Sequence, residues 1–204
     1  MPSSAGDLAE RVEALVKEAE AGTSAELVVV IAGSSARYAG VIGWALGAAA
    51  LGATAFFCWS PWVFDDGWLP IDVLGVSVAV AGLVGTSFRA RRVLTPARER
   101  ARCVALAADA AFWQEAVHAT KARTGILVYV SLLERMVLIR ADLAVAASVP
   151  AAAWNTALAG VQAPFTTPDA FATAFRALGV VLAEHLPRAD DDENESPDAP
   201  RVRR

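Results

Sequence analysis

The sequence has few of the residues that build disulfide frameworks and zinc sites, because its 204 residues include two cysteines and two histidines. Cys58 lies in an apolar run, Cys103 lies in an expected helix, and neither belongs to a CxxC pair. His118 and His185 lie outside any HExxH or His-x-His motif. These spacings exclude a disulfide framework and the usual zinc motifs, so we interpret both histidines as structural. Two unpaired cysteines also fit a reducing compartment.

Several other motifs are missing. The sequence has no GxxxxGK[ST], no GxGxxG after a strand and no GxSxG, so nucleotide binding and serine-hydrolase chemistry lack their usual support. Ser131 has no base within reach in the sequence, and we predict that it is a solvent-facing strand residue. The net charge of -4 is mild, which argues against a nucleic-acid partner. The N-terminus lacks the basic and apolar regions of a secretory signal, so the first segment is expected to stay where it is made.

Positive charge is absent from one long interval, because no lysine or arginine lies between Arg37 and Arg89. Within it, residues 38–59 carry no charge, and residues 68–88 carry only Asp72, near one end. Each segment is about as long as a helix needs to be to cross a hydrocarbon core of roughly 30 Å. We therefore predict a hairpin of two transmembrane helices.

Aromatic and basic residues predict the orientation of this hairpin. Trp59, Trp62 and Trp68 cluster around the connection, as is typical of a membrane interface. Six arginines follow the second helix: Arg89, Arg91, Arg92, Arg98, Arg100 and Arg102. By the positive-inside rule this end is cytoplasmic, so both termini are predicted on the cytoplasmic side of the membrane.

Both apolar segments are rich in glycine, including a GxxxG pair at Gly43 and Gly47. Small residues let helices approach closely in a bilayer. We favour packing of the two helices of the hairpin against each other, and the alternative is binding of other membrane proteins or of a second copy.

The hydrophobic hairpin interrupts a soluble domain. Residues 25–32 form a strand-like apolar run before it, and residues 125–142 resemble a β-hairpin after it. Two strands alone are barely stable in water, so the early strand is expected to complete their sheet. The predicted fold is α/β, a small mixed β-sheet flanked by helices, split between residues 5–33 and 94–187, with the transmembrane hairpin inserted after the first strand.

Apolar spacing predicts which helix faces cover this sheet. The residues expected to point inward are Leu8, Val12, Leu15 and Val16 in the first helix, Leu106, Ala110, Trp113 and Val117 after the hairpin, and Trp154, Leu158, Val161, Phe171, Phe175, Leu178 and Leu182 near the C-terminus. Residues 188–204 are charged and rich in proline, which predicts a mobile tail. Its acid cluster at 190–195 is interpreted as solvated, because it lacks the spacing of a cation loop.

The run TGILVYVSLLERMVLIRAD, residues 124–142, resembles the core hairpin of the TPM-domain family, which includes a plant thylakoid acid phosphatase and many bacterial membrane-associated proteins. His-Leu-Pro at 185–187 and Asn-Glu-Ser-Pro-Asp at 194–198 are similar to the His-Phe-Pro and Asn-Glu-Leu-Pro-Asp of short bacterial members. The resemblance covers roughly residues 8–33 and 94–200. It implies a TPM-like fold of a sheet flanked by helices and an association with membranes.

The resemblance also directs attention to Asp142, a weak candidate for a catalytic or metal-binding residue. Relatives tend to read Ala-Asp-Arg-Gly-Ile after the hairpin, whereas this chain reads Ala-Asp-Leu-Ala-Val at 141–145, so the acid is kept and the arginine and glycine are not. Metal-assisted hydrolysis of phosphate esters needs several converging oxygen ligands, and Asp109 and Asp169 are the further possibilities. We favour a structural role in which Asp142 caps the strand exit and pairs with an arginine or a backbone N–H.

The expected function is therefore a membrane-anchored interaction or scaffold module of the TPM-domain type, at the cytoplasmic face of the inner membrane. The alternative is a metal-dependent phosphatase centred on Asp142, with a divalent cation such as calcium. A channel built from glycine-rich hairpins is the weakest hypothesis, since apart from Asp72 neither span offers a polar stripe. The expected partners are the lipid bilayer and other membrane proteins or a second copy.

Overall fold

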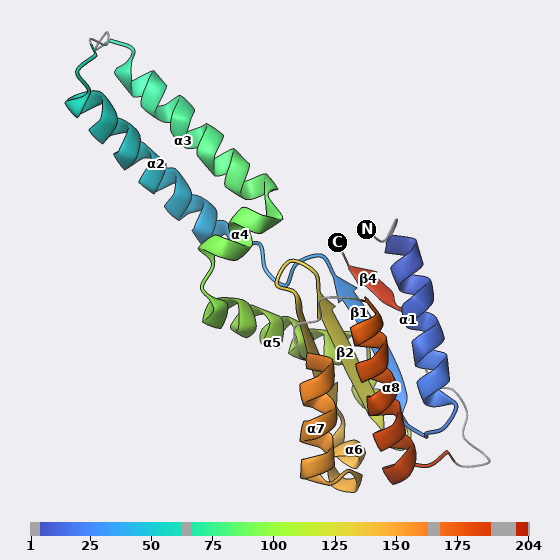
Figure 1. Cartoon of the computed structure of the whole chain (residues 1–204). Coiled ribbons are helices and arrows are strands. Elements are labelled where there is room, and N and C mark those ends of the chain that lie inside the picture. The colour runs from blue at the N-terminus through green and yellow to red at the C-terminus, as the bar shows by residue number, and fades with distance from the viewer. Residues whose placement is uncertain (1–4, 63–66, 163–167, 189–198, 204) are drawn as a thin grey trace. The chain divides into compact units, whose positions relative to one another are not determined.

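A computed structural model describes residues 5–62, 67–162, 168–188 and 199–203 (Figure 1). The chain divides into two units, Met1–Ser35 with Ala101–Arg204, and Ala36–Arg100. The described residues form eight α-helices and four strands. We refer to the first unit as the α/β unit and to the second as the helical unit.

A mixed four-stranded sheet lies at the centre of the α/β unit, in the order β3-β2-β1-β4. β1 (Glu26–Ala32) and β2 (Gly125–Ser131) pair in parallel over seven residues. β3 (Met136–Ala141) is antiparallel to β2, and β4 (Arg201–Arg203) is parallel to β1. Every residue of β1 and β2 is buried, which agrees with the continuous apolar run of β1. The predicted small mixed sheet flanked by helices is confirmed.

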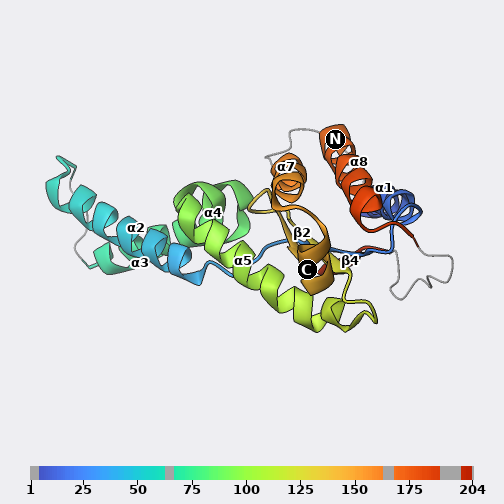
Figure 2. The same cartoon turned by 90° about the horizontal axis from the view of Figure 1, so that it is seen from below.

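Helices α1 (Ala5–Glu20), α6 (Leu143–Ser148), α7 (Ala151–Gln162) and α8 (Pro168–His185) cover one face of the sheet (Figures 1 and 2). The residues predicted to point inward from α1 and α8 are buried here, apart from Leu8, whose side chain lies outside those described. From α7, Val161 is buried, and Trp154 and Leu158 pack against the same core. The spacing of large apolar residues therefore predicted these three faces correctly.

Helix α5 (Ala97–Gln114) and the short 3-10 helix η1 (Val117–Ala119) cover the other face. Val104, Ala108 and Ala111 contact the sheet, whereas Leu106 and Trp113 are 60% and 62% exposed. The predicted face of this helix is thus wrong apart from Val117, which is buried. The large residues misled the prediction, because α5 packs on the sheet through small side chains that let its backbone lie close.

The helical unit contains α2 (Ala39–Trp59), α3 (Leu69–Thr86) and α4 (Phe88–Leu94). α2 and α3 lie side by side, and both are long and apolar enough to cross a membrane, with a mean hydropathy of 1.8 each. α3 ends two residues before the predicted 88, because the chain turns at Ser87, whose ψ of 112° is extended.

The glycines of α2 and α3 do not lie in the interface between these helices as expected. A Cβ added at Gly85 would lie 3.6 Å from Ile42 Cδ1. Additions at the other six described positions would meet nothing within 4 Å: Gly40, Gly43, Gly47, Gly52, Gly75 and Gly82. Our preferred interpretation, that the glycines pack the hairpin together, is wrong for these six. The interface uses Ala53, Ala81 and Val84, which are buried.

The C-terminal prediction of a mobile tail at 188–204 is wrong for the end of the chain. Arg201–Arg203 form β4, and Pro187 makes a bridge to Thr23 just before the predicted tail. The alternating Arg-Val-Arg suits a strand that directs two charges to one face and pairs with an existing edge. Residues 189–198 and 204, including the acid cluster, lie outside the described residues.

The start of β2 depends on a glycine. A Cβ at Gly125 would lie 2.1 Å from the carbonyl oxygen of Val117, which is backbone and cannot rotate away. Gly125→Ala is expected to lower the free energy of unfolding by about 3 kcal/mol or more, as for severe overpacking. Urea unfolding of the detergent-purified protein, followed by circular dichroism, measures the change.

Gly160→Ala is the matched control. This exposed position in α7 has its nearest added contact at 3.8 Å, to Ala174 Cβ. Alanine is there expected to stabilise the protein by about 0.5–1 kcal/mol through helix propensity. Equal stability of the two variants would contradict the predicted role of Gly125.

Candidate functional site

Polar side chains gather on the α5 face of the sheet, toward the carboxyl ends of its three parallel strands. The register forms two rows across the sheet: Tyr129–Val30–Arg201 and Ser131–Ala32–Arg203. Because alternate residues of a strand share a face, both rows lie on the side covered by α5. In open α/β sheets this edge is where ligands commonly bind.

Four residues form a cluster here, which we call the serine–glutamate cluster: the half-buried Ser35 and the buried Tyr129, Ser131 and Glu134. Ser131 donates a hydrogen bond to Glu134 Oε2 and accepts one of 2.9 Å from Ser35 Oγ. The backbone N–H of Ser35 donates to Glu134 Oε1 at 3.0 Å. The phenol oxygen of Tyr129 lies 3.4 Å from Ser35 Oγ.

The prediction that Ser131 faces solvent is wrong, since its exposed fraction is 1%. The turn Leu132–Arg135 between β2 and β3 folds Glu134 back onto Ser131, three residues earlier. The pair Ser-x-x-Glu across an expected hairpin turn was the available signal. Ser35 had none, because it lies 96 residues from its partner Ser131.

The cluster perturbs its one phenol. Burial raises the pKa of Tyr129 above its usual value of 10.0, and the negative charge of Glu134 raises it further. The hydrogen bond with Ser35 and the charge of Arg203 lower it in part. Tyr129 therefore stays protonated at neutral pH and is available as a hydrogen-bond donor.

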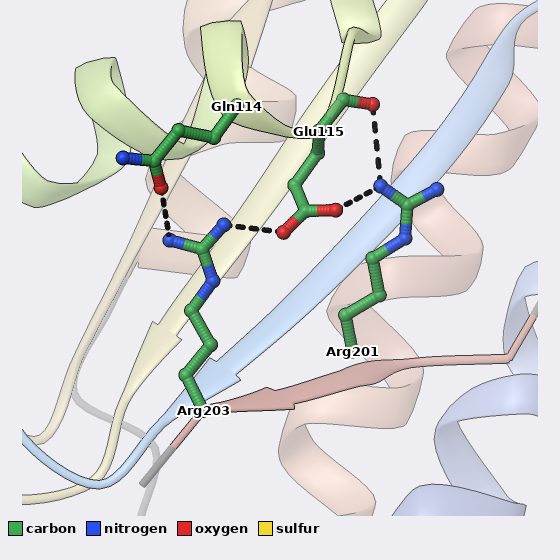
Figure 3. Close-up of polar contacts among 4 residues, drawn as sticks. All are labelled: Gln114, Glu115, Arg201 and Arg203. Carbon is green, nitrogen blue, oxygen red and sulfur yellow. Dashed lines mark hydrogen bonds and ion pairs between the residues drawn. The ribbon is translucent and has the colours of Figure 1, made fainter.

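A second group, which we call the arginine clamp, joins β4 to the end of α5 (Figure 3). Arg201 and Arg203 both form ion pairs with the carboxylate of Glu115. Arg201 also donates to the Glu115 carbonyl at 3.2 Å, and Arg203 donates to Gln114 Oε1 at 2.8 Å. The Glu115 side chain is 16% exposed, so these charges are only partly screened by water.

Burial alone raises the pKa of Glu115, but hydrogen bonds from Arg203 and Arg201 and their positive charges lower it more. The resulting pKa lies below the ordinary value of 4.5. A carboxyl with a depressed folded-state pKa adds stability that is present above its unfolded pKa. That stability is lost as pH falls through the lower folded value.

The clamp and the cluster together hold three chain segments at one sheet edge. Gly33 donates to the Arg203 carbonyl at 3.0 Å, and Leu132 donates to the Ala32 carbonyl at 2.9 Å. Leu133 then donates to the Gly33 carbonyl at 3.1 Å. The end of β1, the turn after β2 and β4 therefore support one another through backbone bonds as well as charges.

The chemistry open to this site is restricted by these pairings. Both carboxylate oxygens of Glu134 accept hydrogen bonds, and Ser131 is enclosed. A nucleophilic serine needs an adjacent base with a free lone pair and room for a substrate. Calcium and magnesium prefer oxygen ligands such as those of this cluster, but they usually need more than the single carboxylate of Glu134. Among the residues that the structure describes, no three or more His, Cys, Asp and Glu side chains come close enough to bind a metal.

Asp142 lies at the end of β3, where it caps α6. Its Oδ1 accepts from the Leu143 N–H at 2.8 Å, and its Oδ2 forms an ion pair of 2.9 Å with Arg123 Nε. The Asp142 side chain is 4% exposed. Asp142 therefore has the two partners that the favoured structural role predicted, a backbone N–H and an arginine.

The other candidate residues are distributed elsewhere. Asp109 on α5 forms an ion pair with Arg140 on β3 at 2.5 Å, and the side chain of Asp169 lies outside those described. The ring of His118 contacts that of Trp113 in a tilted arrangement, with centroids 4.3 Å apart and planes at 49°. His185 ends α8.

No family model matches the chain, and no curated protein matches it. Its structure is similar to the NMR structure of the BA42 protein from the psychrophilic bacterium Bizionia argentinensis, with a TM-score of 0.57 and 15% identity. The similarity covers 97% of this chain and 94% of that chain. At this identity it supports the α/β fold alone, so the resemblance to the TPM-domain family stays a prediction.

The arginine clamp is tested by Glu115→Gln, which removes the charge and keeps the size. Losing two charge-assisted hydrogen bonds is expected to cost about 1.5–3 kcal/mol locally. Hydrogen exchange at the Gly33 amide, which bonds to Arg203, should speed up by at least about tenfold. In the wild type the protection of this amide, relative to its intrinsic exchange rate at each pH, should fall in acid only below the ordinary carboxyl pKa, whereas the variant should lose this pH dependence.

Glu13→Gln is the control. Glu13 forms an exposed ion pair of 2.7 Å with Lys17 in α1, worth about 0.5 kcal/mol or less. It should leave exchange at Gly33 unchanged. Unaltered exchange in Glu115→Gln would mean that backbone pairing alone holds β4.

Proposed function

We propose that the protein is a membrane-anchored interaction or scaffold module of the TPM-domain type. Its α/β unit lies at the cytoplasmic face of a bacterial inner membrane, and α2 and α3 cross the bilayer. The observation that supports this best is the parallel pairing of β1 with β2 around an insertion that contains two long apolar helices. Paired strands share one side of a membrane, so an inserted hairpin must leave and return.

Further observations support the anchor and its orientation. Trp59, Trp62 and Trp68, at one end of the hairpin, are 84%, 68% and 62% exposed, as suits rings at the level of lipid headgroups. Arginines gather at the other end. This asymmetry favours cytoplasmic termini by the positive-inside rule.

The interaction role is supported by the outer face of α5. Leu106 and Trp113 lie there with most of their surface exposed, and Ala110 lies between them. Exposed apolar groups on one face often mark contacts with a partner. We expect a membrane protein or a second copy at this surface. The resemblance of residues 124–142 to the TPM-domain hairpin supports the family assignment.

A metal-dependent phosphatase centred on Asp142 is the alternative. It rests on the family resemblance and on the acid at the end of the β-hairpin. Against it, both oxygens of Asp142 have protein partners. A cation such as calcium would have to displace Arg123 or share the carboxylate with it.

The topology is tested with thiol labelling in intact cells. Ser60→Cys in a Cys58→Ser background places a thiol at the tip of the hairpin, and native Cys103 lies in α5. A membrane-impermeant maleimide is expected to label position 60 from outside and Cys103 only after the membrane is permeabilised. Extraction by alkaline carbonate, or labelling of both thiols from outside, would contradict the proposed anchor.

The choice between scaffold and phosphatase is tested with Asp142→Ala and Asp142→Asn. The wild-type protein is expected to hydrolyse a generic phosphate ester no faster than either variant does, with or without calcium or magnesium. Loss of the helix cap should lower the unfolding free energy by about 1–2 kcal/mol in the alanine variant. Asparagine is also a good capping residue, so the asparagine variant should keep part of the stability that the cap contributes. Metal-dependent turnover that both variants lose would establish the alternative.

A further inference from the structure

The segment that follows α3 joins basic and apolar side chains in a short stretch. Residues 87–100, here called the basic segment, contain five arginines and one acid, Glu99. Ser87 opens α4 by accepting a hydrogen bond of 3.2 Å from the Ala90 N–H. α4 packs against α2 and α3, and within the helical unit it lies at the end of the hairpin where α2 begins and α3 ends (Figure 1).

Two of the five arginines have partners within the protein. Arg100 Nη1 donates to the Arg92 carbonyl at 2.6 Å, which satisfies a carbonyl near the end of α4. The guanidinium of Arg91 lies 5.0 Å from the centroid of the Phe88 ring. The side chains of Arg89, Arg92 and Arg98 make no hydrogen bond or ion pair with any described residue. Three cations are therefore free to bind an external anion.

Apolar side chains accompany these cations. Phe88, Val93 and Leu94 are 55%, 82% and 52% exposed on the seven residues of α4. Exposed apolar surface beside guanidinium groups is the composition of helices that lie in the interfacial region of a bilayer. The turn at Ser87 directs the chain away from the direction of α3, as such a position requires (Figure 1).

We propose that the basic segment binds the headgroups of anionic phospholipids, with Arg89, Arg92 and Arg98 on the phosphates and Phe88, Val93 and Leu94 among the upper acyl chains. The inference rests on the proposed membrane anchor and deepens it by naming a lipid class. Clustered arginines beside a membrane span favour acidic lipids. Guanidinium groups also bind phosphate oxygens in pairs.

The test is native mass spectrometry of the full-length protein from mixed micelles that contain equal amounts of phosphatidylglycerol and phosphatidylcholine with the same acyl chains. Each arginine near an anionic surface contributes a factor of about five in affinity. The wild type is expected to retain more phosphatidylglycerol. R89Q/R92Q/R98Q should bring the ratio of the two lipids close to one, and the corresponding lysine variant should keep most of the preference.

R11Q/K121Q/R135Q is the matched control, because it removes three exposed cations of the α/β unit and the same net charge. It should preserve the lipid ratio. A wild-type ratio near one, or an equal loss in the control, would overturn the inference. The thiol-labelling experiment distinguishes a failure of lipid binding from a failure of the anchor. The predicted topology without a lipid preference would overturn only the lipid-binding inference. A lipid preference without the predicted topology would overturn only the transmembrane anchor.

Discussion

The parallel pairing of β1 with β2 is the constraint on which the rest of the molecule depends. Parallel neighbours cannot be joined by a tight turn and need a long crossover connection. Here the crossover contains α2, α3 and α4 before α5 returns the chain to the sheet. The two strands nevertheless pair over all seven residues. Under the proposed membrane anchor, any segment inserted between the two strands must return the chain to the same side of the bilayer, which two crossing helices do and one does not.

The second consequence of this pairing is an unequal division of the two sheet faces. Four helices cover one face, and α5 with η1 covers the other among the described residues. Val104, Ala108 and Ala111 of α5 are buried against this second face. Toward the carboxyl ends of the strands the same face becomes polar. Buried polar groups are costly unless they are paired, which explains why the serine–glutamate cluster and the arginine clamp form continuous networks.

β4 illustrates how a strand can depend on charge more than on apolar burial. It has three residues, and its one apolar side chain, Val202, is 54% exposed. Its attachment therefore comes from the β1 ladder and from the two arginines on Glu115. Charged partners of this kind allow the C-terminus to complete a sheet whose central strands were formed by distant parts of the chain.

The predictable parts of the fold are those whose signal is local. The continuous apolar run of β1, the hairpin turn and the spacing of Phe171, Phe175, Leu178 and Leu182 each contain enough information by themselves. The polar site does not, because Ser35 and Ser131 are 96 residues apart, and Arg201 and Glu115 are 86. A serine without a nearby base and an arginine in a polar tail are then interpreted as solvent-exposed.

The face of α5 was mispredicted for a different reason. Periodicity assigns the core to the largest apolar residues, Leu106 and Trp113 among them. A single helix that lies close against a sheet buries alanines and a valine instead. Where a helix backbone lies close to a sheet, only small side chains fit between them, so the largest apolar residues of the helix are not the buried ones. The exposed large residues that result are the features from which an interaction surface is inferred.

Asp142 shows how a family resemblance and a structural requirement can select the same residue. A cap needs one acid at the end of β3, whose oxygen accepts from the Leu143 N–H, and a nearby cation, which Arg123 provides. It does not depend on which side chains follow, since the hydrogen bond is to a backbone N–H and the cation precedes β3 in the chain. The substitution of Leu143 and Ala144 for the arginine and glycine of the family pattern leaves this cap intact. Both carboxylate oxygens of Asp142 are thus engaged within the protein, and the cap and the ion pair together account for an acid at this position.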